Sequence, residues 1–467
     1  MHRQNSNVVQ HPGRTWDSSA MIPFCLAKIR RLPDESFVAF SPVCDSEIGL
    51  DYRGIRILEL CDGERTIEEI ESRIPALWPP VSIDSVDSVR RFLGEMNSRG
   101  IVSFRKRAIE ESLPLPPRTV FWDITARCNL RCLHCYNPEG LTTHDEVSDE
   151  AARKTLVEMQ SFGVSNLVFT GGEPFARPGF PKLLAYAAEL EFPYVSAATN
   201  GTLFRREFFG QLRHPNLFIQ ISIDGSTPAI HDRMRGVEGS FECALAALKQ
   251  LQTEGVQVKT NTTVTRLNFH DVPNIIDLLT AIGVPFRFQS MAAIGRGGLN
   301  ADQIMLSPSE FKFLMEYLVS RNIDAGGLSF TLDDPPELTC DPEAPGACGA
   351  GSSVCAITPS GIVVPCTYLP GLNGVDIRFH PFGEIWRHSR CLNFFRSIRL
   401  GELHGHCTAC AWFARCRGGC RAECYTDGDL FGSNRNCWIA EELLEPKGAS
   451  MTCKQSDALN PRQVTYE

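Results

Sequence analysis

Three cysteines in one short segment are the residues best suited to chemistry in this 467-residue chain. Cys128, Cys132 and Cys135 have the spacing C-x3-C-x2-C, and they follow an apolar stretch, residues 119–125, that predicts a β-strand. Three thiolates in one loop can hold three irons of a cubane cluster and leave the fourth iron open to an exogenous ligand. A zinc site built from the same thiols is the alternative.

A glycine-rich turn one strand–helix unit later supports the cluster interpretation. Residues 170–174, Thr-Gly-Gly-Glu-Pro, end the next predicted strand. Adjacent glycines let a ligand approach the backbone closely, because no Cβ is in the way. A plain Gly-Gly turn is the alternative, but the position at the end of a strand favours a ligand site beside the cysteine loop.

The cysteine loop and the glycine turn together resemble the radical SAM superfamily, whose members reductively cleave S-adenosylmethionine (SAM) at such a cluster. The resemblance implies a [4Fe–4S] cluster on the three cysteines. It also implies that Gly171 and Gly172 meet the aminocarboxylate of SAM, with Glu173 near its ammonium group. The cluster would bind SAM through its open iron and deliver one electron, giving methionine and a 5′-deoxyadenosyl radical.

Further SAM contacts are implied by the ends of the third and fourth predicted strands. Asn200 ends the third strand, while Ser222 and Asp224 end the fourth. Arg235 is expected to pair with the SAM carboxylate. His134, inside the cluster loop, is expected to lie against the adenine. For each of these residues an ordinary turn or surface role stays open.

A second group of cysteines lies near the C-terminus and resembles the SPASM extension of radical SAM enzymes. Cys348 is followed by Gly361 and Cys366, and a second run has the spacing C-x2-C-x5-C-x3-C before a last cysteine. The resemblance implies two auxiliary [4Fe–4S] clusters. Their implied ligands are Cys348, Cys355, Cys366 and Cys420 for the first, and Cys407, Cys410, Cys416 and Cys437 for the second. Cys340 competes with Cys355 for the first cluster, and a zinc ribbon is the alternative for the whole group.

One difference from the family pattern excludes one of the reactions that relatives catalyse. Sulfatase-maturing relatives have an aspartate that acts as a base directly after the cysteine corresponding to Cys366, and this chain has Thr367 there. Formylglycine formation is therefore discounted. The sequence identifies no other catalytic base.

Composition excludes several other classes of function. A net charge of −9 and a pI near 5.7 argue against a nucleic-acid partner. No apolar run reaches the roughly 18 residues of a spanning helix, so no membrane partner is expected. The polar N-terminus is unlike a secretory signal, which predicts a cytoplasmic protein. Nineteen cysteines in such a protein indicate metal ligation rather than disulfides.

Residues 21–107 predict a separate N-terminal domain after a loose tail. Alternating stretches within residues 26–40 predict a hairpin. Apolar spacing predicts helices that start near Tyr52, Thr66 and Ser82, and Thr66 forms a capping box with Glu69. Three helices and a hairpin are typical of a winged helix-turn-helix.

This domain resembles the PqqD-like peptide chaperone of pyrroloquinoline quinone biosynthesis. The matching segments are residues 57–63, Ile-Leu-Glu-Leu-Cys-Asp-Gly, and residues 66–70, Thr-Ile-Glu-Glu-Ile. The resemblance implies that a leader peptide adds as a strand to an exposed edge. The alternatives are a DNA-binding winged helix, for which clustered Lys and Arg residues are too few, and a structural appendage.

Six strands alternate with helices in the middle of the chain. The predicted strands are Val120–Thr125, Asn166–Thr170, Tyr194–Ala198, Phe218–Ile223, Gln257–Val264 and Phe286–Ser290. The fold class is therefore α/β, a partial (β/α)6 TIM-like barrel over residues 118–325 with its chemistry at the C-terminal strand ends. A Cys-rich SPASM domain is predicted for residues 326–446.

The combined hypothesis is a radical SAM oxidoreductase or maturase that abstracts hydrogen from a ribosomally made precursor peptide to form a cross-link or another oxidative modification. A flavodoxin- or ferredoxin-type protein is its expected electron donor. A radical SAM oxidase acting on a small molecule, such as a tetrapyrrole side chain, is the first alternative. A non-catalytic zinc-binding adaptor is the second.

Overall fold

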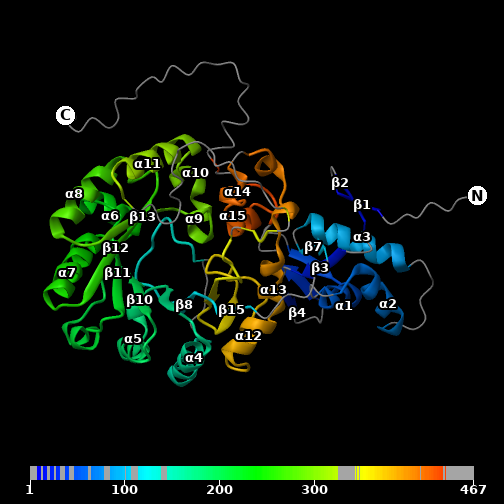
Figure 1. Cartoon of the computed structure of the whole chain (residues 1–467), viewed down its shortest axis with the longest axis horizontal. Coiled ribbons are helices and arrows are strands. Elements are labelled where there is room, and N and C mark those ends of the chain that lie inside the picture. The colour runs from blue at the N-terminus through cyan, green and yellow to red at the C-terminus, as the bar shows by residue number, and fades with distance from the viewer. Residues whose placement is uncertain are drawn as a thin grey trace, which may run out of the picture.

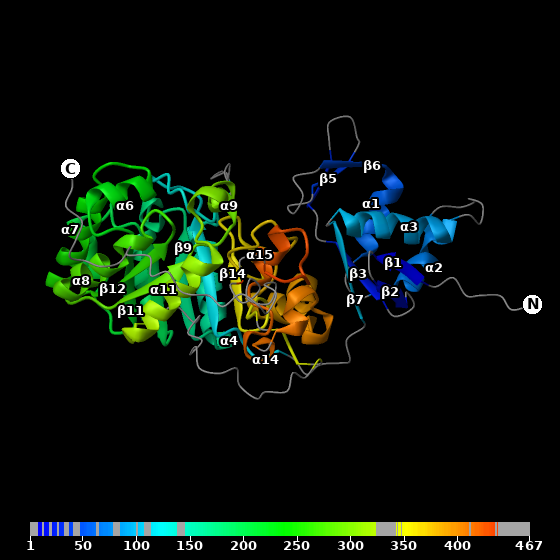
Figure 2. The ribbon, with the colours of Figure 1, turned by 90° about the horizontal axis from the view of Figure 1, so that it is seen from above.

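The computed structural model has three parts along the chain (Figure 1). An N-terminal unit in blue and a β/α unit in cyan and green lie on either side of a C-terminal unit in yellow and orange, and Figure 2 shows the same order from above. The structure describes residues 8–11, 14–17, 21–25, 28–31, 37–40, 47–61, 65–77, 85–99, 101–106, 114–137, 145–323, 342, 344–346, 348–410, 412–434 and 437.

The β/α unit is built on six parallel strands, as predicted. They are β8 (Thr119–Thr125), β9 (Asn166–Gly171), β10 (Tyr194–Thr199), β11 (Leu217–Ser222), β12 (Gln257–Val264) and β13 (Phe286–Ser290). Each strand pairs with the next along the chain. The predicted strands agree with these bounds to within one residue at each end.

Helices and short turns connect these strands and follow the last one. The first set is α4 (Asp149–Phe162), α5 (Phe180–Glu189), α6 (Pro228–Arg235), α7 (Ser240–Thr253) and α8 (Val272–Ile282), and after β13 come α9 (Gly295–Leu299), α10 (Ala301–Ile304) and α11 (Pro308–Ser320). Short 3-10 turns are η2 (Pro174–Ala176), η3 (Arg206–Gln211) and η4 (Phe269–Asp271). Local capping defines α4, because Ser148 accepts a bond from Ala151 N–H and Gly163 ends the helix in the left-handed conformation.

Alternation along the strands separates an apolar outer face from a more polar inner face. Leu217, Ile219 and Ile221 of β11 are buried in the main core with residues of α4, α5, α7 and α8. The residues between them, Phe218, Gln220 and Ser222, point to the other side and stay half-buried. The inner face is therefore the surface available for a ligand.

Three strands of the C-terminal unit extend the same sheet. β14 (Val354–Ile357) runs parallel to β8, and β15 (Ile362–Val364) and β16 (Val375–Asp376) follow in antiparallel order. The nine-stranded sheet thus crosses the boundary predicted near residue 325. The remaining helices of this unit are α12 (Phe382–His388), α13 (Arg390–Ser397), η5 (Leu400–Glu402), η6 (Gly405–Ala409), α14 (Phe413–Cys416) and α15 (Arg421–Thr426).

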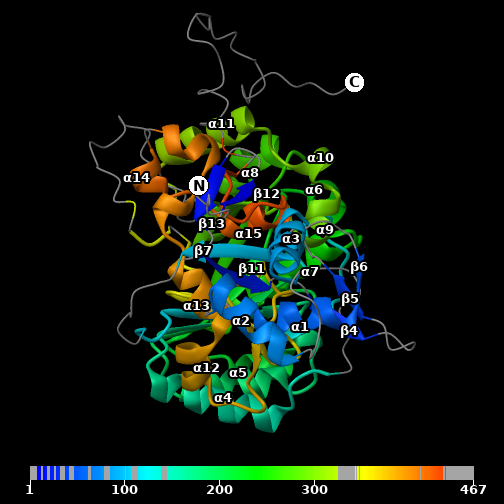
Figure 3. The same cartoon turned by 90° about the vertical axis from the view of Figure 1, so that its right-hand side faces the viewer.

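The described residues of the N-terminal unit form three helices and three small sheets. This unit faces the viewer in Figure 3. The helices are α1 (Tyr52–Leu60), α2 (Ile67–Leu77) and α3 (Ser85–Ser98). The sheets pair β1 (Val8–His11) with β2 (Arg14–Asp17), β3 (Met21–Cys25) with β7 (Val102–Lys106), and β4 (Lys28–Arg31) with β5 (Phe37–Phe40) and β6 (Glu47–Leu50).

Several local predictions for this unit can be compared directly. The Thr66–Glu69 capping box is confirmed, since each residue accepts a bond from the backbone N–H of the other. The expected hairpin corresponds to β4 and β5. The prediction of a loose tail before residue 21 was wrong for β1 and β2, because these two strands pair with each other. The predicted helix start at Ser82 lies outside the described residues.

No helix within the described residues is long and apolar enough to cross a membrane.

Candidate functional site

The cysteine loop leaves the C-terminal end of β8, where the fold predicts chemistry. It runs without regular structure through residues 126–137. Burial raises the pKa of Cys135, and the neighbouring Cys132 thiol raises it further. The same two thiols act on Cys128. All three predicted cluster ligands therefore lie within electrostatic reach of one another.

The Gly-Gly-Glu turn holds this loop from one side. The N–H of Gly172 donates to the Thr125 carbonyl at 2.8 Å, and the N–H of Glu173 donates to the Arg127 carbonyl at 2.7 Å. A Cβ on Gly172 would collide with that same Arg127 carbonyl, and one on Gly171 would collide with the Thr125 carbonyl. The two glycines therefore leave room for the backbone of the cluster loop. From the sequence alone, they were expected to leave room for a ligand.

A second cradle, which sequence reasoning missed, holds the loop from the other side. The N–H of Gly297 donates to the Cys135 carbonyl at 2.8 Å, and Arg296 Nη1 donates to the Cys132 carbonyl at 3.1 Å. A side chain on Gly295 would collide with the Tyr136 carbonyl. The Gly-Arg-Gly-Gly segment after the sixth strand was the signal that could have revealed this contact.

Glu173 is buried and its carboxylate already has three donors. Oε1 accepts from the Thr199 hydroxyl at 2.7 Å and from Phe175 N–H at 3.1 Å, and Oε2 accepts from Asn200 N–H at 2.7 Å. Burial nevertheless raises the pKa of Glu173. The side chain of Asn200 donates to Asn129 in the cluster loop at 2.9 Å. The predicted residues at the ends of β9 and β10 are thus joined to each other and to the loop.

The predicted residues after β11 form a buried charged group beside Cys132. Arg235 Nη2 lies 2.7 Å from Asp224 Oδ2, and Arg235 Nη1 lies 3.7 Å from the Cys132 sulfur. His134 Nε2 lies 3.3 Å from the same carboxylate oxygen. Arg235 and His134, expected to contact SAM, therefore both meet Asp224 in the structure. Ser222 ends β11 on the inner face and is half-buried.

Burial and charge determine how this group is protonated. Burial lowers the pKa of His134 to about 4 although Asp224 opposes the change, so the imidazole is neutral at pH 7. Burial raises the pKa of Asp224, but the opposing effects, of which the positive charge of Arg235 is the largest, outweigh it, and the pKa lies below its ordinary value. Asp224 is thus an anion that neutralises Arg235 beside the cluster loop.

A buried Asp–Tyr pair at the same strand ends was also missed. The Tyr136 hydroxyl lies 3.2 Å from Asp123 Oδ1 and 3.1 Å from the Thr170 hydroxyl. Burial raises the pKa of Asp123 to about 7, with the Tyr136 bond opposing the shift. Tyr136 packs edge-on against Tyr368 at 5.4 Å between centroids. The sequence signal for this pair was Asp123, an acidic residue within the otherwise apolar strand β8.

The C-terminal cysteines form two further groups. Burial raises the pKa of Cys366 well above its ordinary value, and Cys348 and Cys420 raise it further. Cys355 does not join them: it lies in β14, fully buried in the core shared with β8. Its thiol pKa is raised by burial and is influenced by Arg396 rather than by another thiol. Cys340 lies outside the described residues.

The second C-terminal group contains all four of its predicted members. The pKa of Cys416 is raised to about 11, mainly by burial and in smaller part by three neighbouring thiols. These neighbours are Cys407, Cys410 and Cys437. Close thiolates repel one another unless cations lie between them, so all three thiol groups fit iron–sulfur clusters as their ligands. No three His, Cys, Asp or Glu side chains among the described residues are already arranged to hold a metal ion, so the structure shows the thiols gathered in three groups rather than three formed metal sites.

Comparison with known families agrees with this geometry. Residues 122–279 match the radical SAM superfamily, and residues 348–411 match the SPASM family, described as an iron–sulfur cluster-binding domain. The first match contains the cluster loop and the ends of β9 to β11. The second contains Cys348 and Cys366 together with the start of the last cysteine group. Such domains bind [4Fe–4S] clusters and SAM, so these are cofactors of this chain.

Curated relatives cover most of the chain. The AdoMet-dependent heme synthase of Nitratidesulfovibrio vulgaris is 30% identical in an alignment 366 positions long, which covers 73% of this chain and 97% of that protein. The mycofactocin maturase MftC of Mycolicibacterium smegmatis is 30% identical over 71% of this chain and 87% of its own length. The subtilosin biosynthesis protein AlbA of Bacillus subtilis is 26% identical over 91% of this chain and 98% of its own length.

A solved structure shows the same fold over nearly the whole chain. Streptococcus suis SuiB bound to its precursor peptide SuiA matches with a TM-score of 0.56 and 14% identity, over 90% of this chain and 98% of that chain. The fold, the gathered thiols and the relatives agree with one another. The chain therefore belongs to the radical SAM superfamily, in the branch that carries a SPASM iron–sulfur domain, and it is an enzyme.

Proposed function

We propose that this enzyme is a maturase that oxidatively modifies a ribosomally made precursor peptide. The observation that carries the proposal is the folded N-terminal unit ahead of the barrel. AlbA matches 91% of this chain, and the peptide-bound SuiB structure matches 90%. The heme synthase of N. vulgaris matches only 73% of it.

The N-terminal unit, residues 21–107, is assigned as a PqqD-like winged-helix recognition domain. Its three-stranded sheet has β4 and β6 as outer strands, and β5 pairs with both. An extended peptide binds such an outer strand through main-chain hydrogen bonds. Residues 118–325 are assigned as the radical SAM barrel and residues 326–446 as the SPASM domain.

The cysteines are assigned to three clusters. Cys128, Cys132 and Cys135 hold the SAM-binding cluster. Cys348, Cys366 and Cys420 hold one auxiliary cluster, and Cys407, Cys410, Cys416 and Cys437 hold the other. Cys355 is left out as a core residue of β14.

Residues at the C-terminal ends of the barrel strands are assigned as the binding site for SAM. Gly171, Gly172, Glu173, Asn200 and Ser222 surround it. Asp224, Arg235 and His134 support the Cys132 side of the site, because these three residues already meet one another there. When bound, the cluster and SAM supply a 5′-deoxyadenosyl radical that removes a hydrogen atom from the substrate. The protein orients the target C–H bond and excludes water.

The proposed reaction also needs a protein that donates electrons and a cellular compartment in which thiols stay reduced. A flavodoxin- or ferredoxin-type protein is assigned as the electron donor to the SAM-binding cluster. The chain is assigned to the cytoplasm, whose reducing conditions keep thiols available as ligands.

A second candidate function is oxidation of a tetrapyrrole side chain. It is favoured by the heme synthase of N. vulgaris, which the chain covers over 97% of its length. In that case the N-terminal unit has a structural role only.

A binding experiment separates the two functions. A labelled precursor peptide, encoded in a reading frame beside the gene, is titrated with the reconstituted enzyme and with a variant lacking residues 1–110. We expect tight binding by the full chain and a loss of at least tenfold in the variant, while SAM cleavage without peptide persists in both. Equal activity on the peptide after the deletion would exclude peptide recognition by this unit.

A further inference from the structure

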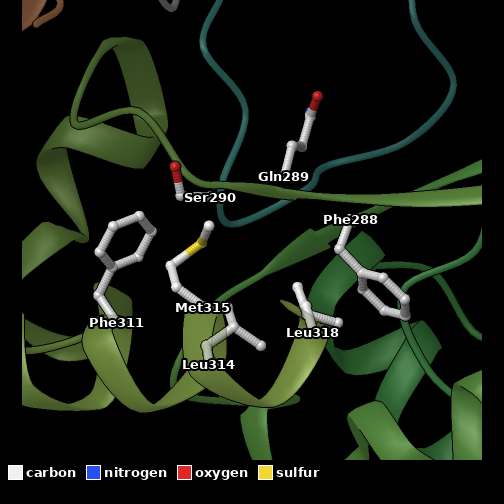
Figure 4. Close-up of a pocket in the computed structure, with 7 residues that line it drawn as sticks. All are labelled: Phe288, Gln289, Ser290, Phe311, Leu314, Met315 and Leu318. Carbon is white, nitrogen blue, oxygen red and sulfur yellow. The ribbon is translucent and has the colours of Figure 1, made fainter. Parts of the chain in front are cut away.

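The inner face of the β/α sheet carries a cation whose role the assignments above leave open. Arg287 is the second residue of β13, and its neighbour Phe288 lies in the outer core. Figure 4 shows the same alternation one residue later, with Gln289 directed away from Phe288 and from the apolar side chains of α11. Arg287 therefore shares the inner face with Gln289.

A neighbouring strand orients the guanidinium group. Arg287 and Asn261 are register partners on β13 and β12, and Arg287 Nε donates to Asn261 Oδ1 at 2.9 Å. The next pair along these strands is similar, since Gln289 donates to the Thr263 hydroxyl at 3.2 Å. These neutral polar side chains orient the guanidinium group of Arg287 without neutralising its charge.

The two terminal nitrogens of Arg287 have no hydrogen-bond or ion-pair partner in the described part of the chain. This differs from other arginines of the same unit. Arg177, Arg213 and Arg235 each have an acidic partner within 2.7 Å. Arg287 is half-buried as a residue, and its terminal nitrogens are not among the buried polar atoms that lack a partner, so a ligand can reach them.

Arg287 also faces the reactive end of the barrel. Asn261 of β12 is the register partner of Arg287 and also of Ser222, the last residue of β11. Asp224 follows Ser222 by two residues and meets His134 of the cluster loop at 3.3 Å. An anion on Arg287 would thus lie on the inner face, on the side of the cluster loop.

We propose that Arg287 binds a carboxylate of the substrate inside the barrel. A guanidinium fork matches the two oxygens of a carboxylate through parallel N–H···O bonds. One cation among neutral amides and hydroxyls suits a single negative charge. The inference rests on the proposed function only for the source of the carboxylate, which is an acidic or C-terminal residue in a precursor peptide and a propionate in a tetrapyrrole.

The test uses the reconstituted holoenzyme and two pairs of probes. The first pair is the precursor peptide encoded beside the gene and a form whose core carboxylates are all converted to amides. The second pair is iron coproporphyrin III and its tetramethyl ester. Equilibrium binding is measured for the wild type, Arg287→Gln and Arg287→Lys. SAM cleavage without substrate and iron content show whether each variant is folded and loaded.

We expect the wild type to bind the acid form of one probe about 10- to 100-fold more tightly than its neutral form. Arg287→Gln should lose this preference, and Arg287→Lys should recover part of it because the charge remains while the fork is lost. The matched control is Arg213→Gln, which removes an arginine half-exposed to solvent and paired with Glu254. This control should keep the wild-type preference.

The outcomes separate this inference from the proposed function. A preference for the acid porphyrin that depends on Arg287, without binding of the peptide, rejects the peptide substrate and supports the carboxylate site. Equal binding of the acid and amide peptides by the wild type supports the peptide substrate and overturns the site. If neither pair shows an acid preference, or if Arg287→Gln retains it, the inference is overturned.

Discussion

The cluster loop after β8 and the last cysteine group both present cysteine thiols, but the backbone around the two groups is supported differently. Backbone bonds from two sides hold residues 126–137 against the Gly-Gly-Glu turn and the Gly-Arg-Gly-Gly segment. In the last group, Cys407 lies on η6, Cys410 directly follows η6 and Cys416 ends α14, and these two elements are only five and four residues long. The first site is shaped by the scaffold, whereas the second has little regular structure of its own.

This difference shows two ways to build a thiolate site. An enzyme that must leave one iron open needs a loop fixed without the help of a fourth protein ligand. A fully ligated cluster can instead order the chain around it, since metal binding then contributes to folding. The following experiments test whether the two regions depend on metal in these different ways.

The largest effect is expected for Cys132→Ala. Removing one of three cluster ligands should abolish formation of 5′-deoxyadenosine from SAM, because no fourth thiol of the loop can replace it. Chromatographic measurement of 5′-deoxyadenosine checks this. Cys243→Ala, which changes an exposed cysteine in α7, is the control and should keep full activity. Unchanged turnover in Cys132→Ala would refute the assignment of the loop.

Removal of iron by a chelator should affect the two regions unequally. We expect amide hydrogens of residues 402–434 to lose most of their protection, while those of β8 to β12 keep it. The reason is that the barrel strands have a large apolar core and the C-terminal group has short helical turns. Hydrogen exchange followed by mass spectrometry measures both regions in one sample. Equal loss of protection in the barrel would contradict the comparison.

Gly172→Ala tests the scaffold of the cluster loop. The added Cβ would collide with the Arg127 carbonyl, so the loop must shift. We expect the SAM-binding cluster to load poorly and SAM cleavage to fall by about tenfold or more, since small displacements in an active site have such costs. Gly210→Ala is the matched control, because nothing lies within 4 Å of its Cβ position. Normal iron content and cleavage in Gly172→Ala would show that the close contact is not needed.

The sequence alone was sufficient for the parts of the fold that depend on local pattern. The six barrel strands were predicted because apolar and β-branched residues recur in short runs between helical segments. The thiol groups were implied by the resemblance of the cysteine pattern to the SPASM extension, as with Cys407, Cys410 and Cys416. These signals lie within a few residues of one another in the chain.

What the sequence did not reveal depends on contacts between distant segments. β14 pairs with β8 across more than 200 residues, and nothing in its four residues specifies that partner. The position of Arg287 on the inner face of the sheet is defined only after the strands have paired. Cys355 was predicted as a ligand from the resemblance to the SPASM extension, in competition with Cys340, and only the strand register places it in the core.

The smallest effect is expected for Cys355→Ala, which distinguishes a core cysteine from a ligand. Its thiol packs in the barrel core, so truncation should cost about 1 kcal/mol of unfolding free energy and leave the iron content unchanged. Cys366→Ala is the matched variant, and it should lose about four irons because Cys366 lies among other thiols. Iron assays and thermal unfolding of both variants check this. An equal loss of iron in Cys355→Ala would mean that β14 reaches the first auxiliary cluster, and the C-terminal site would then share the rigid scaffold of the barrel.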